Sequence, residues 1–223
     1  MSAQKFRTTE GGLIERPFPL KFTFNGKSYT GYQGDSLASA LLANGVHLIG
    51  RSFKYHRPRG IMSAGSEEPC GMVQMREGNR TEPNIRATQV VLYDGLIANS
   101  QNCWPSVEFD LQSINNTFKR MLPAGFYYKT FKWPGFLWMT YEKVIRHAAG
   151  MGKSSVERDP DYYDHMHAHC DVLVVGAGPA GLMAAKSAAA SGARVILADD
   201  RAEFGGQLNE LVENIDGKPA SQW

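Results

Sequence analysis

The sequence has few cysteines, no long apolar run and almost no net charge. Its three cysteines, Cys70, Cys103 and Cys170, lie far apart among 223 residues, which excludes a disulfide framework and suits a reducing compartment. No stretch approaches the roughly 20 apolar residues that span a bilayer, and residues 1–12 lack the apolar core of a secretory signal. A formal net charge of +2 gives no electrostatic case for nucleic-acid binding. We therefore expect a cytoplasmic protein that binds neither nucleic acid nor a membrane.

Motifs for several kinds of catalysis are also missing. There is no Ser-His-Asp or Cys-His arrangement for a nucleophile, no P-loop and no EF-hand loop. His165, His167 and His169 alternate, which would put three imidazoles on one face of an extended segment, but no further ligand set lies nearby. We therefore predict no catalytic residue and no metal site in this chain.

Residues 1–105 are expected to form an α+β domain. Apolar and polar residues alternate over 20–24, and Asn25-Gly26 is typical of a tight turn, so residues 29–32 should return antiparallel. Apolar residues at helical spacing over 37–42 follow a capping Ser36, and Asn44-Gly45 should end that helix. Further strands are expected at 71–75 and 87–93. A hairpin, a helix and more strands are consistent with a β-grasp fold.

Residues 106–168 form a connector rich in aromatic residues, with a break at Pro134-Gly135 and a short helix expected over 137–149. Rings left in water would cost about 25 cal/mol per Å² of apolar area, so we expect them to pack on a surface of this chain or of a partner. The basic segment 51–60 could steer an acidic cofactor tail or a nucleic-acid strand, but a structural loop or a contact between subunits is the favoured interpretation.

The composition changes at residue 169, and the pattern over 169–223 predicts the start of an α/β domain. Residues 172–175 and 194–198 are short apolar strands of the kind buried in parallel sheets, and an alanine-rich helix runs between them from about 179 to 191. This strand–helix–strand order is a βαβ unit.

The motif Gly176-Ala-Gly178-Pro179-Ala180-Gly181 joins that strand to that helix and predicts a dinucleotide site. The first glycine permits a tight turn, the second lets the backbone approach a pyrophosphate, and the third lets the helix pack close to the strand. Free N–H groups at the helix N-terminus would face the phosphates, and Pro179 fits the first turn because its missing N–H costs nothing there.

An acidic residue for the ribose follows at Asp199, 23 positions after Gly176. Its carboxylate could accept hydrogen bonds from the ribose hydroxyls and repel a 2′-phosphate, which favours NAD or FAD over NADP. Asp200 is adjacent, so either Asp199 or Asp200 could be the residue that binds the ribose. The positive charge of Arg201 could weaken the discrimination against NADP. Gly205, Gly206 and Gln207 form a second loop that could pass close to the cofactor or be an ordinary surface turn.

Only 15 residues follow Leu208, too few for the other strands of a doubly wound sheet. We therefore expect an N-terminal fragment or truncated product of a larger enzyme, with an intact protein completed by a partner chain as the alternative.

The whole chain resembles the alpha subunits of heterotetrameric sarcosine oxidases. The resemblance rests on four stretches: Arg51-Ser-Phe-Lys-Tyr-His-Arg-Pro-Arg-Gly60, Glu67-Glu68-Pro69, Ala124-Gly-Phe-Tyr-Tyr-Lys-Thr130 and His167-Ala-His-Cys-Asp-Val-Leu-Val-Val-Gly176. It implies a ferredoxin-like β-grasp domain followed by the start of a Rossmann-type FAD/NAD(P)-binding domain. Related opine and hydrogen-cyanide-forming dehydrogenases share this layout.

In that family the complex oxidises sarcosine with oxygen to glycine, hydrogen peroxide and a one-carbon unit, which leaves as formaldehyde or is captured by tetrahydrofolate. The resemblance implies NAD at the glycine motif, with FAD and FMN elsewhere in the complex, and partners that are the beta, gamma and delta subunits. The folate-binding region lies beyond this sequence, so the chain alone should be inactive. Alternatives are a subunit of an opine or amino-acid dehydrogenase with FAD at the glycine motif, and a non-catalytic scaffold fragment.

The first domain departs from its cluster-bearing relatives, which hold a two-iron, two-sulfur cluster on a C-x4-C-x2-C loop. Aligning that loop here puts Ser63, Glu68 and Gly71 at the three thiolate positions; Cys70 is out of register by one, and only Cys103 matches the distant fourth ligand. Because iron takes thiolate ligands in such sites, the resemblance implies a domain without a cluster that serves as a scaffold.

Overall fold

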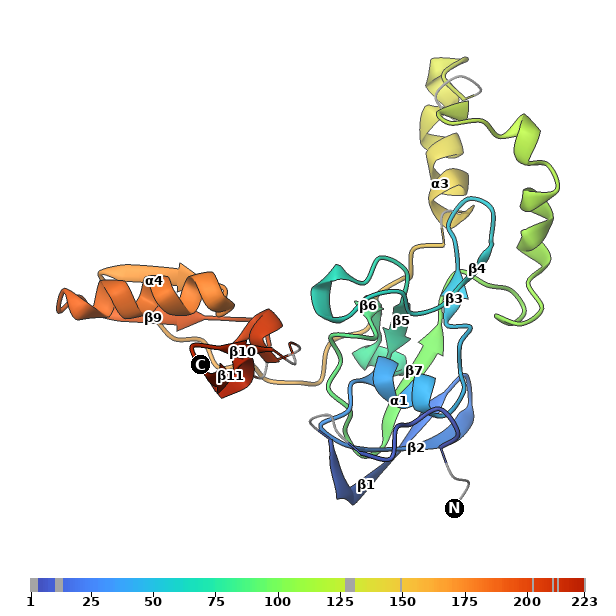
Figure 1. The fold of residues 1–223 in the computed structure, drawn as a ribbon. Helices are drawn as coiled ribbons and strands as arrows, with labels where there is room; N and C mark the ends of the chain where they lie inside the picture. Colours follow the sequence, from blue (N-terminus) through green and yellow to red (C-terminus); the bar gives the residue numbers. More distant parts are fainter. Residues whose placement is uncertain are drawn as a thin grey trace. The chain divides into compact units, whose positions relative to one another are not determined.

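A computed structural model describes residues 4–10, 14–126, 131–148, 150–201, 203–209, 211 and 213–222. The chain divides into two compact units, Met1–Pro160 and Asp161–Trp223. Figure 1 shows helices and sheets in both, so the predicted mixed α/β character is confirmed. None of the described helices is both long enough and apolar enough to cross a bilayer.

The first unit is built on a five-stranded mixed sheet in the order β2-β1-β7-β5-β6. Strands β1 and β7 run parallel, and the other neighbours are antiparallel. The strands are β1 (Glu15–Phe24), β2 (Lys27–Gln33), β5 (Met72–Met75), β6 (Glu82–Arg86) and β7 (Leu96–Ser100). The expected hairpin is confirmed: Phe24 pairs with Lys27, and Asn25 and Gly26 both have positive φ, as a two-residue turn of this type requires.

Helix α1 (Leu37–Ala43) covers the sheet, close to its predicted bounds. The Ser36 hydroxyl accepts a hydrogen bond from the Ser39 N–H, so the predicted cap is confirmed, and Asn44 ends the helix. The apolar face of α1 packs with the inward residues of the strands, and the largest fully buried members of this core are Phe22, Phe24, Leu37, Leu41, Ile49, Leu96 and Val73.

The prediction of a strand over 87–93 is wrong. The strand that pairs with β5 is β6, which ends directly before residue 87. The chain turns after β6, where the Gln89 N–H donates to the Arg86 carbonyl. The next carbonyls then bind the start of α1: Ala87 accepts from Ala38 and Val90 accepts from Leu37. Because these two carbonyls accept hydrogen bonds from α1, they do not pair with a neighbouring strand.

The basic segment forms the small hairpin of β3 (Gly50–Arg51) and β4 (Pro58–Arg59). Its side chains hold the connector: Arg51 Nε donates to the Val107 carbonyl at 2.8 Å, and the Tyr55 hydroxyl donates to the Leu122 carbonyl at 2.8 Å. A buried His56 Nδ1 lies 2.7 Å from Asp110 Oδ2. These bonds support the structural-loop interpretation of the segment.

The connector carries the short 3₁₀ helices η3 (Leu111–Asn116), η4 (Lys119–Met121) and η5 (Gly135–Leu137) and the helix α3 (Trp138–Ala148). The predicted helix is therefore confirmed, except that Ala149 lies outside the described residues, as do Tyr127 and Tyr128 of the aromatic set. Phe131 packs on Tyr141 with ring centroids 5.3 Å apart. Trp133 and Phe136 are each 83% exposed, so the described part of this chain does not supply the surface that was expected to cover them.

The second unit contains the predicted βαβ order: β8 (Val172–Val175), α4 (Pro179–Ala190) and β9 (Val195–Ala198). Strands β8 and β9 are parallel, with Val172 opposite Val195 and Val175 opposite Ala198. A two-residue hairpin of β10 (Asn214–Ile215) and β11 (Lys218–Pro219) follows. Within this unit the strands are exposed, as expected for an incomplete doubly wound sheet: Leu173 is 58% exposed and Val175 is 80% exposed. Two strands and one helix have too few neighbours to cover both faces.

Candidate functional site

The glycine loop joins the C-terminal end of β8 to the N-terminus of α4. The Gly176 N–H donates to the Ala198 carbonyl at 2.7 Å, which ties the loop to the end of β9. Gly176 has a φ of +99°, a conformation open to glycine. Gly178 caps the helix with an extended backbone, and Pro179 occupies the first helical position, as predicted.

The glycines differ in the space around them. A Cβ on Gly181 would lie 1.8 Å from the Gly176 carbonyl oxygen, so the helix and the loop can approach this closely only with glycine there. A Cβ on Gly178 would meet no atom of the described residues within 4 Å. The fold therefore requires Gly181, whereas the open side of Gly178 is available to a ligand.

Asp199 lies beside this loop at the end of β9. Its Oδ2 accepts a hydrogen bond from the Ala177 N–H, and its Oδ1 accepts one from the Arg201 N–H at 2.8 Å. These two bonds, with a smaller contribution from the Arg201 charge, lower the pKa of Asp199 below its usual value. Each carboxylate oxygen can accept a second bond, so the ionised group can still bind hydroxyls. The neighbouring Asp200 is exposed.

The second glycine loop packs against the first. The Gly205 N–H donates to the Ala177 carbonyl at 2.8 Å, and a Cβ on Gly206 would lie 3.1 Å from Gly178 Cα. The structure thus brings Gly205 and Gly206 to the glycine motif. Gln207, in the short helix η6 (Gly206–Asn209), and Ala180, in the first turn of α4, are both exposed.

These residues form a cradle of the kind that holds a dinucleotide. In the first turn of α4, Pro179 has no N–H and Leu182 donates to the Gly178 carbonyl. The N–H groups of Ala180 and Gly181 have no acceptor within the helix, and they lie at the positive end of its dipole. The open backbone at Gly178 adjoins them, and the Asp199 carboxylate is the nearby acceptor for ribose hydroxyls. The cradle can bind and orient such a ligand.

The loop at the predicted cluster position does not fit a two-iron, two-sulfur cluster. Ser63, Glu68 and Gly71 stand at the three thiolate positions, and none has a sulfur. A Cβ on Gly71 would lie 2.6 Å from Ile61 Cδ1, so a side chain there is not accommodated without movement. At the fourth position, burial raises the pKa of Cys103 and the Asp110 carboxylate raises it further, which disfavours the thiolate.

Within the same loop, sequence reasoning missed a buried acid. Glu68 is 1% exposed, and four backbone N–H groups of its own loop donate to its carboxylate. Hydrophobic periodicity does not signal such a residue. The available signals were its place at the second thiolate position and in the stretch Glu67-Glu68-Pro69 that carries the family resemblance.

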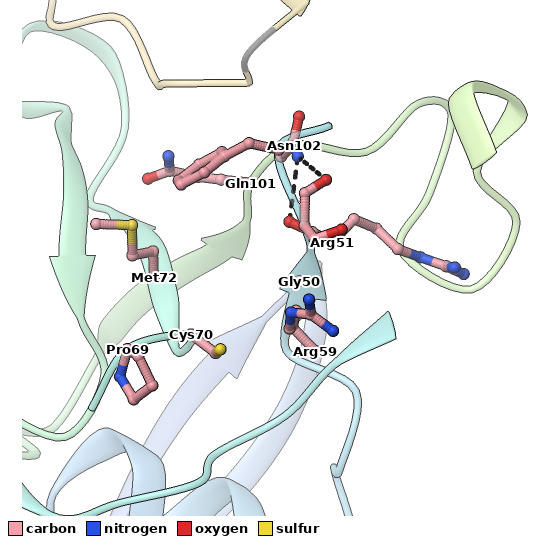
Figure 2. Close-up of a pocket in the computed structure, with 10 residues that line it drawn as sticks. Gly50, Arg51, Arg59, Pro69, Cys70, Met72, Gln101 and Asn102 are labelled. Carbon is pink, nitrogen blue, oxygen red and sulfur yellow. Dashed lines mark hydrogen bonds between the residues drawn. The ribbon is translucent and has the colours of Figure 1, made fainter. Parts of the chain in front are cut away.

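A small pocket of about 170 Å³ lies beside this loop. Figure 2 shows Cys70 and Met72 on one side and Gly50 with Arg59 on the other, and Asn102 bonded to carbonyls of the β3 segment. Ligand pockets usually measure about 300 to 1,000 Å³, so this space suits a few waters or a small ion better than a cofactor.

His165, His167 and His169 do not assemble a site. Across the residues that the structure describes, no group of three or more histidine, cysteine or acidic side chains could hold a metal ion.

Two family models match the chain. A 2Fe-2S iron-sulfur cluster binding domain matches residues 18–103, and an FAD dependent oxidoreductase domain matches residues 171–222. The first covers the mixed sheet and α1, and the second covers the glycine cradle.

Over 219 residues the chain is 55% identical to the sarcosine oxidase alpha subunit of Rhizobium meliloti (strain 1021), covering 98% of this chain and 22% of that protein. It is 38% identical to the sarcosine oxidase alpha subunit of Corynebacterium sp. (strain U-96), covering 96% of this chain and 18% of that protein. The predicted resemblance to sarcosine oxidase alpha subunits is confirmed. The chain corresponds to an N-terminal portion of these relatives and spans about a fifth of their length.

A shorter match is found to an opine oxidase subunit of Agrobacterium tumefaciens (strain Ach5). It is 53% identical over 45 residues, covering 20% of this chain and 9% of that protein. These three relatives are named as oxidase subunits, and the model that matches residues 171–222 is described as an FAD dependent oxidoreductase.

Proposed function

We propose that the chain forms part of the alpha subunit of a sarcosine oxidase and supplies a dinucleotide site to that enzyme. The identity to sarcosine oxidase alpha subunits over nearly the whole chain supports the substrate, N-methylglycine, and the products glycine, hydrogen peroxide and a one-carbon unit. The chain itself contributes binding rather than chemistry, so it is inactive alone. Its location in the cytoplasm and its beta, gamma and delta partners stay predictions.

The open backbone at Gly178 is the observation that carries the dinucleotide assignment. It lies at the N-terminus of a twelve-residue helix, where the N–H groups attract phosphate oxygens. The ligating set that we propose is the one predicted from the sequence: Gly176, Gly178, Pro179, Ala180, Gly181, Asp199, Asp200, Arg201, Gly205, Gly206 and Gln207.

The two candidate dinucleotides are supported unequally. The resemblance predicted NAD, and no comparison supports it. The matched family model is described as FAD dependent, which supports FAD, the alternative from the sequence. Both fit an acid at the ribose position, whose charge favours NAD or FAD over NADP.

Calorimetric titration of the purified chain with NAD and with FAD tests the site. Gly178 has an extended backbone with a φ of −71°, so valine is tolerated there by the fold. Gly178→Val should abolish binding without lowering the unfolding temperature. Gly135→Val, another glycine with open surroundings, should leave binding unchanged. Binding that survives Gly178→Val would contradict the site, and bound flavin is recognised by its yellow colour.

The first unit is, in this proposal, a β-grasp scaffold without a cluster, and the second is the start of a Rossmann-type domain. The sheet order and the parallel β1–β7 pair support the former, and the parallel β8–β9 pair with its glycine loop supports the latter. Iron and sulfide analysis of the purified chain should find neither element. Two irons per chain would contradict the scaffold assignment.

The match to an opine oxidase favours a second candidate, a subunit of an opine-oxidising enzyme with FAD at the glycine motif. Oxygen uptake by the complete enzyme separates the two. Turnover of sarcosine and not of opines supports the first candidate, and the reverse supports the second.

A further inference from the structure

The carboxylate of Glu68 is enclosed by the amides of its own loop. Its Oε2 accepts the N–H groups of Met62 and Ser63, each at 2.7 Å. Its Oε1 accepts the N–H groups of Cys70 and Gly71, at 2.6 and 3.0 Å. Four backbone donors from both ends of the loop therefore converge on one buried anion.

The loop is closed around this anion. The Glu68 carbonyl accepts a bond from Arg86 Nε at 3.0 Å, and the Gly65 carbonyl accepts one from the Thr88 hydroxyl at 2.6 Å. A Cβ on Gly71 would lie 3.2 Å from Glu68 Cγ, so the side chain fills the space between the loop ends. Burial raises the pKa of Glu68, but the four amide bonds outweigh it and the pKa is lowered.

Converging backbone N–H groups are a general way to hold an anion, and iron–sulfur sites use hydrogen bonds to their sulfurs in the same manner. Here the side chain at the second thiolate position supplies the negative charge itself. Building on the cluster-free scaffold of the proposed function, we propose that residues 61–71 form an anion cradle whose resident anion is the Glu68 carboxylate, in place of any external group.

A consequence separates this assignment from an ordinary buried glutamate. If the amides are arranged for an anion, removing the side chain leaves a cavity lined by donors, and a small carboxylate from solution should fill it. Formate is the probe, because it carries the same two oxygens and little else.

The experiment compares Glu68→Ala with Glu67→Ala, the exposed neighbour in the same loop. Unfolding of the full chain is followed with increasing sodium formate, against sodium chloride at equal ionic strength. Glu68→Ala should lower the first unit's midpoint by about 10 °C, since four buried N–H groups lose their acceptor. Formate should restore much of this loss in a saturable way for Glu68→Ala alone. An unchanged midpoint, or a loss that formate and chloride affect equally, would overturn the cradle.

Glu68→Gln keeps the test valid if the alanine variant does not fold. Because the pKa of Glu68 is lowered in the folded chain, its stabilisation is present above the unfolded value near 4.5 and is lost as pH falls below it. The difference in stability between wild type and Glu68→Gln should therefore be large at pH 7 and shrink toward pH 3. A difference that does not change with pH would overturn the assignment. Iron found in the wild-type chain would instead refute the scaffold proposal, whatever the formate result.

Discussion

The two units of this chain contrast in how they cover their apolar residues. In the first, α1 and the five-stranded sheet bury a continuous core in which Leu37, Leu41 and Leu96 have no exposed surface. In the second, α4 has no buried residue and Leu173 and Val175 of β8 are largely exposed. Yet the glycine loop of the second unit is held by hydrogen bonds between residues of that unit: the Gly176 N–H donates to the Ala198 carbonyl, and the Ala177 N–H donates to the Asp199 carboxylate. A binding loop needs only the residues that adjoin it, whereas a core needs every layer of the domain.

Removing a core side chain should separate the units most strongly. Leu41→Ala should lower the stability of the first unit by about 3 kcal/mol, because it leaves a cavity in a closed core. Leu173→Ala, at a position that is 58% exposed, should change the second unit by about 0.5 kcal/mol. Urea unfolding monitored by a probe in each unit measures both. Equal losses of unfolding free energy in the two variants would contradict the difference in burial between the two units.

A substitution within the glycine motif should be the next largest effect. Gly181→Ala should destabilise the second unit by about 1–3 kcal/mol, since the added methyl would overlap the Gly176 carbonyl. Gly178→Ala, where the methyl meets nothing, should leave unfolding unchanged and weaken only dinucleotide binding. If both variants unfold alike, the different tasks assigned to the two glycines are wrong.

Titration of Asp199 should have the smallest effect. Its pKa is lowered by bonds from the Ala177 and Arg201 N–H groups, so the loop gains stability above the usual carboxyl range and loses it as pH falls through the folded pKa. Asp199→Asn should remove that dependence. Exchange of the Ala177 amide hydrogen with solvent, followed from pH 6 to pH 3, measures it. Wild type and variant with the same pH profile would show that the carboxylate does not hold the loop.

The sequence predicted the parts of the fold whose determinants are local. Asn25-Gly26 specified the hairpin, Ser36 specified the start of α1, and the spacing of Gly176, Gly178 and Gly181 specified the loop between β8 and α4. The strand over 87–93 was mispredicted because backbone carbonyls of this segment accept hydrogen bonds from the N–H groups of α1 rather than from a neighbouring strand. Those hydrogen bonds join residues about 50 positions apart.

The exposure of the apolar run 172–175 was predictable, because two strands and one helix cannot cover it. Internal hydrogen bonding was the feature that local pattern could not predict. The hydrogen bonds of Glu68, Arg51 and His56 join segments of loops that come together only in the folded chain. The motif predicted the candidate binding residues, and the structure added that the Asp199 carboxylate accepts a hydrogen bond from the Ala177 N–H of the loop.

Hydrogen exchange of the full chain, with and without added NAD or FAD, tests whether the first unit alone has a closed core and whether the glycine loop of the second unit binds a dinucleotide. Before ligand is added, amides of β1 and β7 should exchange slowly and those of β8 and β9 much faster, because only the first unit closes its core. Adding the cognate dinucleotide should slow exchange over residues 176–181 and leave β1 unchanged. Strands β8 and β9 as protected as β1 at the outset, or no change over 176–181 with either dinucleotide, would contradict the account.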